Sequence, residues 1–249
     1  MFDLSLWGWV MACLAGLSVG LSKAGFGGVG VIQVYLMAEL FGKNSVGILL
    51  PMLVVADLMV FPAYRKHGSW GPVWRLLWPA ILGMTVGFFL LDWLPENWAK
   101  PLIGVIILSM VLLQLVRGWR PEAFAVFAKS TGFGVGAGVV AGFATMVANA
   151  AGPVFQLFLI SRRMPKMELV GIGVRFFLLV NLIKLPFTGG LGMTTADSLL
   201  FNLKLLPMIV MGVVVGKWLL VRVSQKWFER LVVAFAVLAG TKLLFFTNL

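Results

Sequence analysis

The chain has 249 residues, of which 61% are hydrophobic and 12% charged, and its mean hydropathy is +1.01. A soluble domain of this length needs far more polar surface to cover its core, so the composition excludes that class and predicts one integral membrane domain over residues 1–249. The net charge of +11 does not indicate nucleic-acid binding, because most basic residues gather in short clusters between apolar runs.

Ten apolar segments follow one another along the chain, and each is expected to be a helix. The predicted fold class is therefore all-α and polytopic. The first segment follows Asp3 instead of a basic region, so we interpret it as a retained span and not as a signal peptide. The expected segments are 4–22, 26–41, 45–63, 72–94, 99–117, 129–147, 152–161, 168–187, 200–221 and 227–246.

Four short basic clusters predict the orientation of these segments. If all four lie in the cytoplasm, segments three to five alternate in direction and segments eight to ten alternate in the opposite sense. Each half then holds five segments, an odd number, so the second half is inverted relative to the first and both termini are non-cytoplasmic. The clusters are Arg65, Lys66 and Arg75; Arg117, Arg120 and Lys129; Arg162, Arg163 and Lys166; and Arg222, Lys226 and Arg230.

A weak internal repeat supports the same division. Residues 141–192 resemble residues 15–68, and at an offset of 124 Asp57 falls on Asn181. We expect repeat one at 1–117, a cytoplasmic connector at 118–128 and repeat two at 129–249. Duplication around interrupted apolar segments is typical of transporters that bind their substrate near the middle of the membrane, between two halves.

Each half contains one interrupted pair of segments, broken where glycine and alanine gather at 22–28 and where alanine, glycine and proline gather at 148–153. Segment 26–41 is about 24 Å long as a helix and segment 152–161 about 15 Å, against a membrane core of about 30 Å. We therefore expect each pair to form a hairpin whose tip lies within the membrane, and the two tips to meet near the midplane. The alternative is an ordinary turn at the membrane surface.

Polar residues at membrane depth mark the candidate site. Asp57 lies well inside its segment, where a charge must be paired, hydrated or protonated, and its repeat counterpart is Asn181. Asp57 is the candidate for proton coupling, and the alternative is a structural ion pair with Lys23. Lys23 and the glycines after it predict an anion site, because unpaired N–H groups at a helix start favour anions. The alternative for Lys23 is a side chain that reaches the interface.

Two further cations and two glutamines lie in apolar segments. We expect Arg175 to pair with Glu168 or to line the entrance, and Lys184 to reach toward the outer interface. Gln33 and Gln156 are expected to hydrogen-bond a ligand or, with preference, another helix. Glycine-rich patterns in segments six and nine permit close helix packing either within one subunit or in a homodimer.

The chain resembles the TauE/SafE family of membrane permeases, also called the sulfite exporter family, over essentially its whole length. The resemblance is carried by Asn149-Ala-Ala-Gly-Pro153 and Asn181-Leu-Ile-Lys-Leu-Pro186, with the glycine motif 25–28 and the basic loop 64–68 in the first half. It implies transport of sulfite, sulfonates or similar anions across the cell inner membrane. It also implies a substrate site at the motif positions, with Asp57, Asn181 and Lys184 beside it. These motif positions are Lys23, Gly25, Gly27, Gly28, Asn149, Gly152 and Pro153.

These features together predict secondary transport of a small anion, by rocking of one inverted repeat against the other. No catalytic grouping and no metal-ligand spacing stand out, so we expect no enzyme activity, metal or cofactor. Two alternatives stay open. One is an uncoupled anion channel or facilitator with the same site, and the other is a non-transporting membrane subunit of a larger complex.

Overall fold

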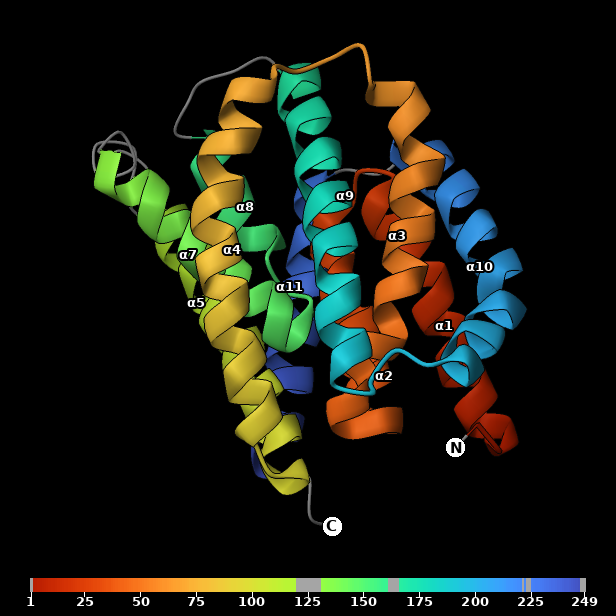
Figure 1. The fold of residues 1–249 in the computed structure, drawn as a ribbon. Coiled ribbons are helices and arrows are strands. Elements are labelled where there is room, and N and C mark those ends of the chain that lie inside the picture. The colour runs from red at the N-terminus through yellow and green to blue at the C-terminus, as the bar shows by residue number, and fades with distance from the viewer. Residues whose placement is uncertain (1, 120–130, 161–165, 221, 223–224, 247–249) are drawn as a thin grey trace.

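The structure is a computed structural model that describes residues 2–119, 131–160, 166–220, 222 and 225–246. The regular structure of these residues is helical, as Figure 1 shows, which confirms the predicted all-α class. The predicted connector 118–128 lies almost entirely outside them. The helices are α1 (Leu6–Lys23), α2 (Gly30–Phe41), α3 (Ser45–Tyr64), α4 (Trp70–Trp93), α5 (Glu96–Trp119), α7 (Thr131–Ala148), α8 (Gly152–Ile160), α9 (Lys166–Gly190), α10 (Ala196–Leu220) and α11 (Gln225–Phe245), with 3₁₀ turns η1 (Gly27–Val29) and η2 (Gly42–Asn44).

Six helical stretches among the described residues are long and apolar enough to cross a membrane. With the predicted apolar segments, this makes the chain a multi-pass membrane protein. By contrast, α2 has 12 residues and α8 has 9, which correspond to about 18 Å and about 14 Å of helix. Neither length crosses an apolar core of about 30 Å, so both interrupted pairs contain a helix too short to span.

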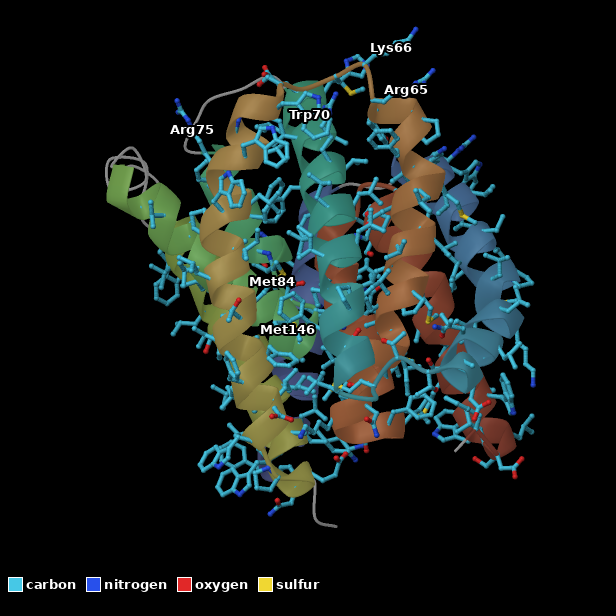
Figure 2. All side chains as sticks on the ribbon, viewed as in Figure 1. Arg65, Lys66, Trp70, Arg75, Met84 and Met146 are labelled. Atoms are coloured by element: carbon cyan, nitrogen blue, oxygen red, sulfur yellow. The ribbon has the colours of Figure 1, made fainter. Side chains whose placement is uncertain are left out.

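Successive helices alternate in direction, and the start of α1 and the end of α11 lie at the same end of the molecule (Figure 1). The side chains of Arg65, Lys66 and Arg75 lie at the opposite end (Figure 2). This arrangement matches the expected separation between the first basic cluster and the two termini. Residues 120, 129, 162 and 163 of the other clusters lie outside the part of the chain that the structure describes.

One helix from each half of the chain packs among helices of the other half. The most extensive helix-to-helix contacts among the described helices join α4 to α7 and α1 to α10. We call α1, α2, α3 and α10 the first bundle, and α4, α7, α8 and α9 the second bundle. Helices α3 and α9 pack together where the two bundles meet, and α5 packs against α11 beside them. The sequence analysis divided the chain at its middle and did not predict this exchange.

Glycines allow the exchanged helices to approach closely. A Cβ added at Gly142 of α7 would lie 2.7 Å from the Cα of Ala80 in α4. A Cβ added at Gly212 of α10 would lie 3.0 Å from the Cα of Gly20 in α1. Because a side chain at either position would meet backbone, glycine is the residue that permits these two contacts. The glycines of the ninth segment therefore pack within one subunit.

Candidate functional site

A cavity of about 500 Å³ lies where the two interrupted pairs meet α3 and α9. Small-molecule sites in proteins have volumes of about 300–1,000 Å³, so this cavity has the size of a ligand site. Gly27 lies in η1 beside the cavity, and Lys184 is not among the residues that line it. The other residues predicted for the site do line it: Lys23, Gly25, Gly28, Asp57, Asn149, Gly152, Pro153 and Asn181.

Asp57 lies inside α3 and links the two bundles. Its Oδ1 lies 2.7 Å from Nζ of Lys23, and its side chain is 1% exposed. Its Oδ2 accepts a hydrogen bond of 2.7 Å from Nδ2 of Asn181 in α9. Positions 57 and 181, which the repeat made equivalent, are thus in direct contact. The ion pair compensates a buried carboxylate, whose charge would otherwise be costly in this environment.

Lys23 is the last residue of α1, where the partial negative charge of the helix end favours a cation. The chain turns away directly after it, because Gly25 has a φ of +132° that glycine adopts readily. The Lys23 side chain is 14% exposed and lines the cavity. Its Nζ also lies 4.8 Å from the ring centroid of Phe177, a cation–π contact. The cation therefore faces the cavity while Asp57 neutralises it.

Asn149 fixes the second interruption. Its φ of +52° is a left-handed conformation that asparagine tolerates better than most residues. Its Nδ2 donates to the carbonyl oxygen of Val46 in α3 at 3.1 Å, and its Oδ1 accepts from Nζ of Lys184 at 2.6 Å. The same Nζ donates to the carbonyl oxygen of Thr145. The amide that borders the cavity is thus held by both long central helices.

The expectation that Lys184 reaches the outer interface is wrong. Its side chain is 0% exposed, and its ammonium group points inward to Asn149 and Thr145. The physical reason is that α9 continues to Gly190, beyond the expected end at 187, so Lys184 lies well inside the helix. The acceptors of the second interruption also lie within reach, which the sequence spacing did not reveal.

Both short helices begin at the cavity. Gly30 and Val31 of α2 and Gly152 and Pro153 of α8 line it. The first N–H groups of a helix have no intrahelical acceptor, and the helix dipole makes this end favourable to anions. Proline suits the start of α8 because the missing N–H is one of those unpaired donors. The site therefore brings two helix starts and one lysine to the same space.

Helices α5 and α11 supply an apolar wall that the sequence analysis missed. These segments look like ordinary apolar spans, so nothing in their composition marked their faces toward the cavity. The signal available was Gln114, a polar residue inside the apolar α5 that also lines the cavity. Gln33 lines it too, and its Oε1 accepts from Oγ of Ser22 at 3.5 Å. The Gln156 side chain lies outside the described part of the structure. The apolar wall consists of Ile107, Met110, Val111, Val232, Val233 and Ala236.

Arg175 does not line the cavity and does not pair with Glu168. Its Nη2 donates to the carbonyl oxygen of Arg65 at 2.7 Å, and its Nη1 donates to the carbonyl oxygen of His67. Arg65 is the C-cap of α3 and His67 follows it, so the guanidinium donates to carbonyls just beyond the helix end. Glu168 instead accepts from Oγ of Ser69 at 3.4 Å. Arg175 therefore fastens the end of α3 to α9.

Comparison with known proteins gives one result that covers nearly the whole chain. The model of the family described as "Sulfite exporter TauE/SafE" matches residues 12–243. No curated protein and no solved structure matches the chain.

Proposed function

Because the chain belongs to the sulfite exporter TauE/SafE family, a family of membrane transporters, we propose that it is a secondary transporter of a small anion, with its substrate site in the cavity between the two bundles. Sulfite, a sulfonate or a similar sulfur-containing or organic anion is the proposed substrate. The cell inner membrane is the proposed location, with both termini on the non-cytoplasmic side.

The observation that carries this proposal is the convergence of three features on one cavity. The starts of α2 and α8 and the ammonium group of Lys23 all border it. Helix starts and lysine favour negative charge. The side-chain amide of Asn149 adds a polar group to the cavity lining without adding charge. We infer an anionic ligand from this chemistry and not from the family name alone.

The composition of the cavity favours an organic anion over a small inorganic one. Most of its polar groups lie at the two interruptions and on α3 and α9, whereas α5 and α11 provide a wall that is apolar except for Gln114. A ligand with a charged head and an apolar body satisfies both sides. A sulfonate has this form, and sulfite does not fill about 500 Å³. A sulfonate is therefore the preferred substrate class in this proposal.

Asp57 is the proposed coupling residue. It is buried, it borders the cavity and it is ion-paired to the lysine proposed for substrate contact. Ionisable residues inside membrane helices commonly serve in proton relays. Asn181 completes the pair of central residues, as a neutral hydrogen-bond donor in the other bundle.

The two halves are proposed to be inverted repeats, and the proposed motion takes the exchanged helices into account. The contacts between α1 and α10 and between α4 and α7 are close backbone contacts. A motion of residues 1–117 against 129–249 would have to break both. We infer that each bundle moves as one body, so that α10 travels with α1 and α4 travels with α7. The bundles would then rock about the contact between α3 and α9.

Anion uptake into proteoliposomes that contain the purified chain tests this function. The panel is sulfite, two sulfonates, sulfate, a carboxylate and one amino acid, each with and without an imposed pH gradient. Transport of one anion class, stimulated by the gradient and lost in Lys23→Ala, is the expected result. Lys242→Ala, at an exposed lysine remote from the cavity, is the matched control and should transport like the parent.

The same measurements separate the alternatives. An anion flux that is the same with and without the pH gradient, both in the parent and in Asp57→Asn, would favour an uncoupled channel or facilitator. A folded chain that moves none of these anions, with Lys23→Ala indistinguishable from the parent, would refute the transport proposal and favour a subunit that needs a partner.

A further inference from the structure

The lysine that lines the cavity has a carboxylate partner before any ligand enters. Lys23 borders the cavity, but its Nζ lies 2.7 Å from Oδ1 of Asp57. The other oxygen of the carboxylate accepts from Asn181. The lysine suited to hold an anion is therefore already neutralised by a buried carboxylate.

If an anion bound Lys23 and no proton entered with it, Asp57 would stay charged and would lose its ion-pair partner. Removing one partner of a buried ion pair is strongly unfavourable, because the remaining charge is neither solvated nor compensated. Asn181 provides one hydrogen bond but no charge. The contact between the anion and Lys23 therefore requires that the negative charge of Asp57 be removed at the same time.

We propose that the anion occupies the cavity together with one proton, which binds Oδ1 of Asp57, so that the carrier takes monoanions and moves them without net charge. This inference rests on the proposed function of the cavity. Lys23 changes its partner from the carboxylate to the anion, while Oδ2 of Asp57 keeps the hydrogen bond from Asn181. One negative charge enters and one is neutralised, so the cluster has the same charge when it is loaded.

The other charged groups around α3 have their own partners and do not contact Asp57. On α9, Lys184 does not line the cavity itself but donates to two residues that do, Asn149 and Thr145. Arg175, also on α9, donates to the carbonyl oxygen of Arg65, the C-cap of α3. In η2, the ammonium of Lys43 donates to the carbonyl oxygen of Leu94.

Two further polar groups beside α3 in the described part of the chain are uncharged. Asn202 of α10 donates to the carbonyl oxygen of Ile48, and Gln33 of α2 lines the cavity. Among the described residues in contact with Asp57, only Lys23 is charged. The change of charge on loading therefore belongs to Asp57, Lys23 and the anion.

This balance defines the substrate class. A monoanion such as a sulfonate or hydrogen sulfite is matched by one proton on one carboxyl group. A dianion such as sulfate brings a second negative charge, which the described cavity residues do not neutralise. The structure thus favours sulfonates over sulfate by charge as well as by shape.

The experiment uses methanesulfonate as the probe, because a sulfonate stays a monoanion at every pH of the assay. Any proton that crosses with it must therefore travel on the protein. Proteoliposomes carry a trapped pH dye, and radiolabelled methanesulfonate uptake is measured beside the pH change. The expected ratio is one proton for each anion. A membrane potential set with potassium and valinomycin should leave the rate unchanged, and a pH gradient should accumulate the anion about tenfold for each pH unit. Sulfate should not be transported.

Asp57→Asn keeps the size of the side chain and removes the proton site. The ratio of protons to anions should fall from one to zero, and any remaining flux should respond to the membrane potential because Lys23 then stays unpaired. Glu39→Gln is the matched control, since it makes the same carboxylate-to-amide change in a partly exposed ion pair with Lys242. It should behave like the parent.

The parent measurements alone decide the inference, so it does not depend on how well a variant folds. Methanesulfonate flux without protons, flux driven by the membrane potential, or sulfate transport at a similar rate would each overturn the proton-matched mechanism while the transport proposal stands. A parent that moves neither methanesulfonate nor any anion of the panel above would overturn both.

Discussion

The closeness of α4 and α7 predicts an unequal effect of the same substitution at two positions of α7. Gly142→Ala adds a Cβ at 2.7 Å from the Cα of Ala80, whereas ordinary van der Waals contact begins at 3.4 Å. The obstacle is backbone, and the carbonyl oxygen of Ala80 lies closer still, so α7 must move away from α4 by more than about 0.7 Å. Gaps of about 0.5–1 Å already forfeit a quarter to a half of the dispersion energy of the atoms involved. Overpacking of this kind costs about 3 kcal/mol, the upper part of its usual range.

Gly136→Ala is the control, because nothing lies within 4 Å of a Cβ added there. Both variants gain about 1 kcal/mol of helix propensity from the loss of a glycine, so the difference between them isolates the packing cost. We expect Gly142→Ala to be less stable than Gly136→Ala by about 3 kcal/mol, or about 6–12 °C in melting temperature for a chain of this size. The assay is the fraction of monodisperse protein on size-exclusion chromatography after heating in one detergent. Equal midpoints for the two variants would refute the close contact of α4 with α7.

Three further substitutions test other contacts. Arg175→Gln should lower the stability by about 2–3 kcal/mol in the same heating assay, because the carbonyls at the end of α3 lose a charged donor; a midpoint equal to that of the parent would contradict this role. Lys184→Met should raise the KM for the transported anion about tenfold, since Asn149 loses the hydrogen bond that fixes it at the cavity; an unchanged KM would show that the amide is held without it. Lys242→Ala breaks an exposed ion pair, and its melting midpoint should change by the equivalent of less than about 1 kcal/mol; a large loss would mean that this pair contributes to the fold.

The repeated pattern singled out two residues that the structure brings into contact. The offset that placed Asp57 on Asn181 joined two residues whose side chains touch in the structure. The interruptions were also predictable, because the glycines at 22–28 and the glycine and proline at 148–153 leave helices too short to cross a membrane. These features depend on local sequence, on length and on spacing, which a single chain displays directly.

The partners of the cations were not predictable in the same way. Arg175 binds the carbonyls of residues 65 and 67, which are far away in sequence and have no side-chain signature. Lys184 binds Asn149, whereas the position of Lys184 in the sequence predicted that its side chain would reach the membrane interface. In both cases an acceptor lies just beyond the end of another helix, so the contact follows from packing and not from spacing.

The exchange of helices was missed for a related reason. Charge clusters and segment counts predict the direction of each helix, but they do not predict which helix lies beside which. The pairing of α4 with α7 depends on the fit of Gly142 against Ala80, and glycine is common throughout apolar membrane segments. Only the packed structure distinguishes a contact glycine from an unpacked one such as Gly136.

The exchanged helices have a consequence for the order in which the protein is completed during synthesis. The second bundle has its α4 in place before α7, α8 and α9 are made, so all its members exist once residue 190 has left the ribosome. The first bundle begins earlier but waits for α10, which ends at residue 220. Until then the Gly20 face of α1 lacks the helix that covers it. The bundle that starts second is therefore finished first, and a chain cut after α9 would contain one complete bundle and one open one.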